Sequence, residues 1–402
     1  MRDVSYNDWN MLKLSERIFY VGVNDTDKVM FEGLWPLPYG VSYNSYIVAD
    51  EKIALIDTVE CGFEDEFISN IEAAAGERNI DYLIINHMEP DHSSLVSYML
   101  ERYPEMMVVA NAKTLPMLKG YYSTPEEKIM VMGEGDRLSL GTCSLSFHMI
   151  PMVHWPETMV TWLEEEGTVF SGDAFGTFGV VPEEVVDDEG TFLQYRDEMI
   201  RYYSNIVGKY GNPVQSALKK LAALPVKRIC STHGPVWEHD TGSVISMYDR
   251  LSRYDVDRGV CIVYGSMYGN TAAAADALAM ELEKEGIPYG IHDLAGNNAG
   301  ELGISGALRD VFKYDTLVVG SPTYNNGIFP PVETFMKALQ ARLVRNRRFY
   351  AFGSYTWSGA SVRQLNESAA AMGFEILGEG LSFPQAYTRE KCDMASLVGL
   401  LK

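Results

Sequence analysis

The sequence predicts an α/β protein built from two domains, and three observations support this expectation. Short apolar runs typical of strands alternate with helical segments along most of the 402 residues. Near residues 250–258 the pattern changes to a regular alternation of strand and helix. Polar residues suited to binding metals or phosphate stand where expected strands end. We therefore expect an αββα sandwich over residues 1–254 and a doubly wound parallel sheet over residues 255–402.

The N-terminal half is predicted to be rich in paired strands. Residues 45–49 and 53–57 flank a short polar turn and predict a hairpin. A helix is expected at 94–103, and a long helical stretch at 191–223 with an interruption at 208–213. Strands that each end next to a His or a carboxylate favour an αββα sandwich with these side chains at one edge. Further strands are expected at 108–109, 138–140, 144–150, 159–163, 168–171 and 228–231.

The C-terminal half repeats a strand–loop–helix unit. Four apolar runs are expected to be strands, and helices are expected to follow them up to the C-terminus. Alternating strands and helices predict a parallel sheet, whose ligand lies on the loops at the carboxyl ends of the strands. The expected strands are 260–264, 316–320, 349–353 and 381–383.

Residues 87–92, His-Met-Glu-Pro-Asp-His, form the densest group of potential metal ligands. They follow an apolar run, residues 81–86, that reads as a buried strand. Three more candidates stand farther along the chain, again at the ends of expected strands. Four of the seven His residues of the chain fall in this set, so a chance grouping is a poor explanation. Seven ligands suffice for two metal ions with open positions: His87, Glu89, Asp91, His92, His154, Asp173 and His233.

Composition narrows the class of protein. The sequence is 47% hydrophobic and 22% charged, as in soluble globular proteins, and it contains neither a membrane span nor a signal peptide. Its five Cys residues form no C-x-x-C pair, which argues for free thiols in a reducing cytoplasm and against an iron–sulfur module. A net charge of −22 makes nucleic acid an improbable partner, whereas a small redox carrier or a neutral substrate fits.

The loop at residues 265–271, Gly-Ser-Met-Tyr-Gly-Asn-Thr, is a candidate phosphate site. Small and hydroxyl residues lead into a helix N-terminus, where free N–H groups and the helix dipole favour an anion. The loop has no Walker A lysine, so a terminal phosphate monoester suits it better than ATP. Loops 321–327 and 354–359 lie at the next sheet edges and carry aromatic residues that can flank a planar ring, although core packing is the alternative for Tyr324 and Trp357. The candidate cofactor-binding residues are Ser266, Met267, Tyr268, Gly269, Asn270, Thr271, Pro322, Thr323, Tyr324, Asn325, Asn326, Gly327, Ser354, Tyr355, Thr356, Trp357 and Gly359.

With these motifs, the chain resembles the flavodiiron proteins, also called A-type flavoproteins, over its whole length. That family joins a metallo-β-lactamase-like diiron domain to a flavodoxin-like FMN domain. Its H-x-E-x-D-H motif stands at residues 87–92, and His154, Asp173 and His233 follow at the family's spacing. The loop at 265–271 is similar to the flavodoxin phosphate loop. No rubredoxin or flavin-reductase extension is seen, so the chain resembles the two-domain class.

The resemblance implies a role for each candidate ligand. His87, Glu89 and His154 would bind the iron nearer the flavin. Asp91, His92 and His233 would bind the other iron, with Asp173 bridging the pair. Hydrolytic members of the fold use zinc and have His where this sequence has Glu89, and a hard anionic oxygen suits iron better than nitrogen does.

The resemblance also implies an activity and partners. Electrons from an external carrier such as rubredoxin would pass through FMN to the two irons, and O₂ would be reduced to water or NO to N₂O. Two ferrous ions and reduced FMN hold the four electrons that O₂ requires. In the family a head-to-tail homodimer brings the flavin of one subunit beside the diiron site of the other. We therefore expect a homodimer or a homotetramer.

Other interpretations remain open at this stage. Trp155 is a candidate for lining the gap between flavin and iron, and Tyr202 and Tyr203 are candidates for donating a hydrogen bond to the bound oxidant. For all three, packing is the alternative. The chain as a whole could instead be a zinc hydrolase with a flavodoxin-like dimerisation domain, or an electron carrier with a vestigial metal site.

Overall fold

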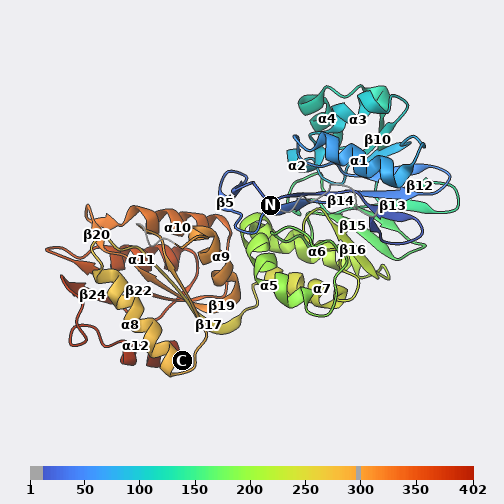
Figure 1. The fold of residues 1–402 in the computed structure, drawn as a ribbon. Coiled ribbons are helices and arrows are strands. Elements are labelled where there is room, and N and C mark those ends of the chain that lie inside the picture. The colour runs from blue at the N-terminus through green and yellow to red at the C-terminus, as the bar shows by residue number, and fades with distance from the viewer. Residues whose placement is uncertain (1–11, 296–299) are drawn as a thin grey trace, which may run out of the picture. The chain divides into compact units, whose positions relative to one another are not determined.

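The computed structural model describes residues 12–295 and 300–402. The described chain forms two compact units (Figure 1). Among the described residues, the first unit holds 12–29, 39–199 and 212–249, and the second holds 30–38, 200–211, 250–295 and 300–402. The main division falls near residue 250, but two short segments of the N-terminal half belong to the second unit.

Two sheets form the centre of the first unit, and apolar side chains fill the space between them. The hairpin predicted at 45–57 is present as an antiparallel pair, whereas the last strands of the same sheet run parallel. The first sheet has the order β1 (Leu12–Lys13), β2 (Ile18–Tyr20), β7 (Tyr46–Ala49), β8 (Ile53–Ile56), β9 (Tyr82–Ile84), β10 (Met107–Asn111), β11 (Ile129–Met132). The second has the order β12 (Arg137–Ser139), β13 (Ser144–Met149), β14 (Met159–Leu163), β15 (Thr168–Gly172), β16 (Arg228–Ser231).

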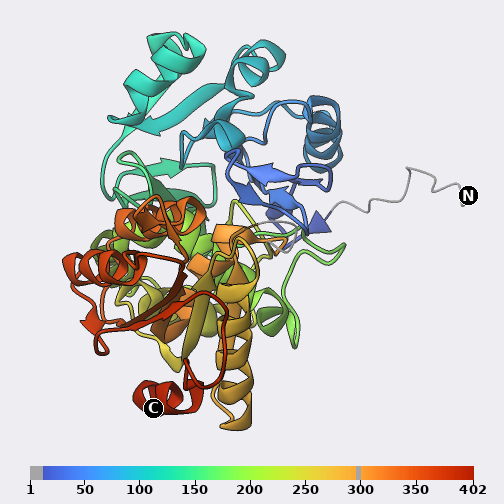
Figure 2. The same cartoon turned by 90° about the vertical axis from the view of Figure 1, so that its left-hand side faces the viewer.

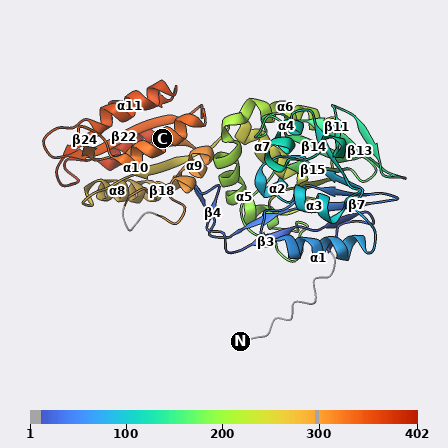
Figure 3. The same ribbon diagram turned by 90° about the horizontal axis from the view of Figure 1, so that it is seen from above.

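Helices cover the outer faces of both sheets, which gives the predicted αββα layers (Figure 1). Helix α1 (Glu64–Ala75) lies against β7 and buries Phe67 and Ile71 (Figure 3). The short β3 (Val23–Asp25) and β6 (Val41–Tyr43) pair beside the main sheets. The other helices of these layers are α2 (Pro90–Ser93), α3 (Val96–Arg102), α4 (Thr114–Tyr122), α6 (Gly211–Leu221) and α7 (Thr241–Ser252).

The interruption predicted at 208–213 lies at 203–210 in the structure, and it is a change of helix type instead of a break between helices. The chain stays helical from α5 (Thr191–Tyr202) into α6, through a π-helical turn at Tyr203–Val207 and a 3₁₀ turn at Gly208–Tyr210. Side chains of the π turn bond back to the Arg201 carbonyl, from Ser204 Oγ at 3.0 Å and Asn205 Nδ2 at 2.7 Å. These bonds place two side-chain donors on the Arg201 carbonyl, where the chain changes from an α-helix to a π-helical turn.

The second unit contains a parallel sheet with the strand order 2-1-3-4-5, where the numbers count its strands along the chain. Helices α8 (Asn270–Lys284) and α12 (Met394–Leu401) pack together on one face (Figure 2), and α10 (Pro330–Ala341) and α11 (Ser361–Ala371) lie on the other. The sequence analysis missed β18 (Tyr289–Asp293) and helix α9 (Gly303–Lys313). Strand β18 lies at the edge of the sheet and is half-exposed, so it has no apolar run that would predict it. The strands are β18 (Tyr289–Asp293), β17 (Asp257–Tyr264), β19 (Tyr314–Gly320), β22 (Arg348–Tyr355), β23 (Glu375–Ile376) and β24 (Leu381–Pro384).

Two arginines explain why residues 30–38 and 200–211 belong to the second unit. Arg342, just after α10, donates to the carbonyls of Ser204 at 2.6 Å and Asn205 at 3.0 Å, and its guanidinium lies 5.1 Å from the centre of the Trp35 ring. Arg201 donates to the Pro36 carbonyl at 2.8 Å. Because these bonds are made to backbone carbonyls and to one ring, no charge pattern in the sequence predicted them.

Asp310 on α9 is buried and accepts hydrogen bonds from His292 Nε2 at 2.8 Å and Arg309 Nε at 2.8 Å. Burial alone raises the pKa of Asp310, but these two partners outweigh it and lower the pKa to about 2. A lowered carboxyl pKa stabilises the fold above about pH 4, and that stabilisation is lost as the pH falls toward 2. We expect Asp310→Asn to cost about 2 kcal/mol at pH 7.

Urea unfolding, followed by circular dichroism at pH 7 and at pH 3, measures this cost. The difference from the wild-type protein should shrink at pH 3. Asp276→Asn, which changes an exposed carboxylate on α8, is the control and should unfold like the wild type at both pH values. Equal destabilisation by Asp310→Asn at both pH values would contradict the prediction.

Candidate functional site

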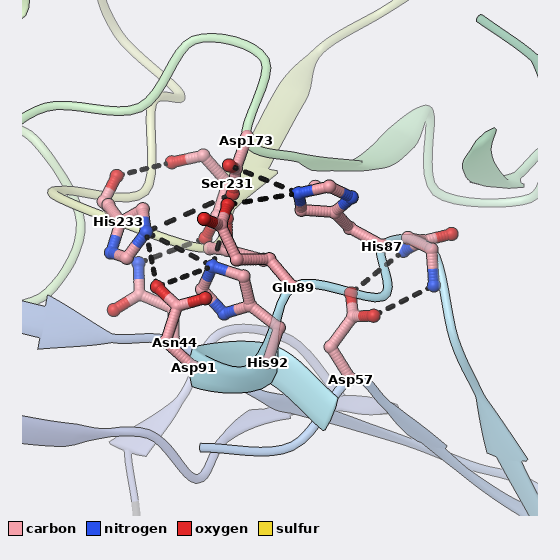
Figure 4. Close-up of polar contacts among 12 residues, drawn as sticks. Asn44, Asp57, His87, Glu89, Asp91, His92, Asp173, Ser231 and His233 are labelled. Atoms are coloured by element: carbon pink, nitrogen blue, oxygen red, sulfur yellow. Dashed lines mark hydrogen bonds and ion pairs between the residues drawn. The ribbon is translucent and has the colours of Figure 1, made fainter. Parts of the chain in front are cut away.

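The loop at residues 87–92 is held in place by a buried carboxylate beneath it. Asn86 follows β9, and its backbone N–H and Nδ2 donate to the two oxygens of Asp57 at 2.7 and 3.1 Å (Figure 4). Pro90 then begins α2 at a position where its missing N–H costs nothing. The turn brings His87 and Glu89 to one side of the loop and Asp91 and His92 to the other.

Four of the predicted ligands form a first group: His87, Glu89, His154 and Asp173. Glu89 Oε2 lies 3.3 Å from His87 Nε2 and 3.0 Å from His154 Nε2. Asp173 Oδ2 lies 3.0 Å from His154 Nε2 and 3.6 Å from His87 Nε2. His154 lies in the loop between β13 and β14 and Asp173 follows β15, so the second sheet contributes these two residues and the loop after β9 of the first sheet contributes the others.

The remaining three residues, Asp91, His92 and His233, form a second group beside the first (Figure 4). Asp91 Oδ2 lies 3.3 Å from His92 Nε2 and 3.4 Å from His233 Nε2. Asp173 turns its other oxygen, Oδ1, toward this group, at 3.1 Å from His92 Nε2. Asp173 is therefore the residue that faces both groups, one oxygen to each.

This geometry fits two metal ions. Ligand atoms that bind a first-row metal at about 2.1 Å lie about 3.0–3.5 Å from one another, and the nearest pairs in both groups show such spacings. Both oxygens of Asp91 are buried and lack a hydrogen-bond donor within the described part of the chain. A buried carboxylate without a donor is costly unless a cation balances it.

The pKa values of the ligand side chains also indicate that the buried carboxylates of the site require positive charge nearby. Burial lowers the pKa of His92, but the charges of Asp91 and Asp173 outweigh it and raise that pKa to about 9. Burial also lowers the pKa of His154, whereas its bonds to Asp173 and Glu89 raise that pKa to about 9. Burial raises the pKa of Asp173, yet the surrounding imidazoles hold it well below its usual range. A bound cation meets this demand in place of protons.

Several side chains around the groups were not predicted from the sequence. Glu157 Oε1 accepts from His87 Nδ1 at 2.9 Å, and Thr232 Oγ1 donates to Asp173 Oδ1 at 2.6 Å. His233 Nδ1 lies 2.7 Å from the Ser42 carbonyl. The ring of Tyr43 packs 5.9 Å from that of His233. The only sequence signal was the position of Glu157, three residues after His154.

The aromatic candidates lie in different places. Trp155 contacts the first group, with its ring 5.2 Å from that of His87 at an interplanar angle of 85°. Tyr202 and Tyr203 belong to the second unit, where they are buried against Phe31 and Phe312 at 6.5 and 5.9 Å between ring centres. These contacts support the packing interpretation of both tyrosines.

A hollow in the second unit lies at the loops predicted to bind a cofactor. Ser266 Oγ accepts from the backbone N–H groups of Gly269 at 3.1 Å and Ala272 at 3.3 Å, which curls the loop around the start of α8. Thr271 Oγ1 and Ser354 Oγ, from two different loops, lie 3.0 Å apart. The residues that line the hollow are Ser266, Met267, Tyr268, Asn270, Thr271, Pro322, Thr323, Ser354, Tyr355, Thr356 and Gln385.

The lining of this hollow has the chemistry that a phosphate group such as that of FMN requires. None of its lining residues carries a charge, although the chain is strongly acidic, and many offer hydroxyl or amide groups. Tyr268 and Trp357 beside it are 89% and 87% exposed, so neither ring is used for packing within the described chain. Asn325 and Asn326 instead form the tip of a hairpin between β20 (Thr323–Tyr324) and β21 (Gly327–Ile328), both with positive φ. Gln385 was not predicted.

Comparison with known proteins adds independent findings. Residues 41–234 match the family described as ODP family beta lactamase, and residues 262–394 match flavodoxin. The chain is 32% identical to the anaerobic nitric oxide reductase flavorubredoxin of Aeromonas hydrophila, over 91% of this chain and 74% of that protein.

Two solved structures are similar over nearly the full length. The rubredoxin oxygen:oxidoreductase from Desulfovibrio gigas has a TM-score of 0.90 and 26% identity, over 98% of each chain. The flavodiiron protein from Giardia intestinalis has a TM-score of 0.90 and 26% identity, over 97% of this chain and 95% of that one. Within the described residues, every helix is too short or too polar to span a lipid bilayer.

Proposed function

The chain belongs to the flavodiiron proteins, and from that premise we propose that it is an oxidoreductase that reduces O₂ to water, NO to N₂O, or both. The observation that carries the proposal is the pair of ligand groups joined by Asp173. His87, Glu89 and His154 would hold one iron, Asp91, His92 and His233 the other, and Asp173 would bridge them. When bound, the two irons and FMN supply the electrons for the reduction.

The residues of the first unit fix the metal pair and leave one side open. The imidazoles of His87, His92 and His233 are completely buried, whereas the side chains of Glu89 and Asp91 keep about a tenth of their surface exposed. Because both carboxylate oxygens of Asp91 are buried, a small oxidant would reach the pair from the side of Glu89. Trp155, half-buried against His87, would cover part of that side and exclude water.

The residues of the second unit would hold FMN. Backbone N–H groups at the start of α8 and the hydroxyl of Thr271 would bind the phosphate. Tyr268 and Trp357 would flank the ring system, and loops 322–327 and 354–359 would meet its polar edge. We propose a small redox protein such as rubredoxin as the electron donor. Action in the cytoplasm is proposed because all five cysteines are free thiols.

An anaerobic experiment tests the proposed function. The purified protein, with iron and FMN determined, is reduced by four electrons and mixed with limiting O₂ or NO in separate runs. We expect rapid loss of either gas together with reoxidation of FMN. The ratio of the two rates then ranks the oxidants. If neither gas is consumed while iron and FMN are both present, the proposal is wrong.

The alternative function is a zinc hydrolase with a flavodoxin-like dimerisation domain. Glu89 argues against it, because a second hard carboxylate in the first group favours iron over zinc. Metal analysis of protein purified from cells grown with both metals separates the two functions. Zinc without iron would favour the hydrolase.

We also propose a head-to-tail homodimer, alone or as half of a homotetramer. The ligand groups belong to the first unit and the flavin site to the second, and the resemblance to the family supports pairing of the two sites between subunits. Sedimentation velocity of the iron- and FMN-loaded protein is expected to give twice or four times the mass of one chain. A species with the mass of one chain that still consumes O₂ or NO would contradict this prediction.

A further inference from the structure

Glu157 is a buried carboxylate outside the seven candidate ligands, yet it is bonded to one of them. Its Oε1 accepts from His87 Nδ1 at 2.9 Å and from the Met88 backbone N–H at 3.0 Å. Its own carbonyl accepts from Asn111 Nδ2 at 2.5 Å, which ties the loop to the end of β10. Held from two elements, the carboxylate keeps the proton of His87 on Nδ1 and leaves the Nε2 lone pair facing Glu89 and Asp173.

Within the described part of the chain, the hydrogen bonds of the second group include none from a ligand imidazole to a carboxylate outside the seven ligands. His233 Nδ1 faces the neutral carbonyl of Ser42 at 2.7 Å. His92 Nδ1 is buried without a hydrogen-bond partner among the described residues. Asp57, a further buried carboxylate near this loop, is hydrogen-bonded to Asn86 and acts on His92 and His87 through its charge alone. The two groups thus offer similar ligands, two imidazoles and one carboxylate each beside the shared Asp173, but differ in what supports them.

We propose that Glu157 is a positioning residue that makes the two metal positions unequal. A carboxylate hydrogen-bonded to a ligand imidazole orients the ring and makes it more basic, and its negative charge favours the more oxidised metal. The metal held by His87, Glu89 and His154 is therefore bound more tightly and is the harder of the two to reduce. This inference rests on the proposed function, because it requires a metal pair at these two groups.

The test uses Glu157→Gln, which keeps the size of the side chain and one acceptor oxygen but removes the charge. Full-length apoprotein is titrated with Fe²⁺ without oxygen, and both binding events are measured. We expect one event to weaken about 10–100-fold and the other to stay unchanged. The potential at which the first electron leaves the iron pair is expected to rise, as followed by electron paramagnetic resonance.

Glu134→Gln is the matched control. Glu134 also accepts from a His Nδ1, that of His148 at 3.0 Å, and from a backbone N–H, that of Met149 at 2.9 Å, but neither residue belongs to the ligand groups. The Glu134→Gln variant should leave both iron affinities and the potential at wild-type values. If Glu157→Gln also leaves both iron affinities and the potential unchanged, and its near-UV circular dichroism matches the wild type, the inference is overturned and the proposed function stands.

A measurement on the wild-type protein covers the case in which Glu157→Gln does not fold. In Zn²⁺-loaded protein, NMR is expected to show the Nδ1 proton of His87 farther downfield than that of His233, because its acceptor is a carboxylate instead of a neutral carbonyl. Equal shifts of the two protons would overturn the inference. If the wild-type protein binds no second Fe²⁺, there is no metal pair, and this result contradicts the proposed function itself.

Discussion

Replacing Asp173 by Ala is expected to abolish gas consumption, with a loss of at least about 100-fold in the rate for O₂ and for NO. Asp173 is the residue whose two oxygens reach both ligand groups, at 3.0 Å from His154 and 3.1 Å from His92. Without it, each position loses a negative ligand and the pair loses its bridge. Bound iron should fall below two per chain, while FMN content should stay at the wild-type level. Metal analysis, flavin absorbance and gas consumption on one preparation measure all three.

Glu183→Ala, which removes an exposed carboxylate that belongs to neither group, is the control for loss of one negative charge. It should keep iron, FMN and activity. Unchanged consumption of O₂ and NO by Asp173→Ala would contradict the diiron interpretation and favour an electron carrier with a vestigial metal site. Loss of FMN together with iron would instead indicate general damage to the fold.

The convergence of the seven predicted ligands was foreseeable from the sequence. Each follows a strand, and strand ends of one sandwich meet at one edge, so residues far apart in the sequence come together. Their role as ligands stays a prediction. The residues that support them were not foreseeable, because a hydrogen bond from an imidazole to Glu157 or to the Ser42 carbonyl leaves no spacing pattern. A backbone carbonyl in particular can come from any residue type.

The elements of the fold also differ in how far the sequence predicts them. Buried central strands such as β17 and β19 are apolar runs and were predicted within a few residues. The edge strand β18 was missed, since one of its sides faces solvent and its sequence is mixed. The assignment of residues 30–38 and 200–211 to the second unit was also missed. Local pattern gives the type of an element, whereas Arg342 and its carbonyl partners determine which unit a short segment joins.

The second large effect is expected at the phosphate loop, where Asn270→Asp should weaken FMN binding about 100-fold. Asn270 is the first residue of α8 and lines the hollow. A carboxylate there would lie beside the phosphate of FMN and repel it. The same charge at a helix N-terminus is favourable by about 0.3–1 kcal/mol, so the fold itself should not suffer. Titration of the apoprotein with FMN, followed by quenching of flavin fluorescence, measures the affinity.

Riboflavin separates charge repulsion from damage to the site, because it has the ring system of FMN but no phosphate. Asn270→Asp should bind riboflavin as the wild-type protein does, and its apoprotein should melt at the wild-type temperature or slightly above. Two iron ions per chain should remain, since the ligand groups lie in the first unit. Equal weakening of FMN and riboflavin would mean that the loop at 265–271 does not hold the phosphate, and the flavin would then have to enter the hollow in another orientation.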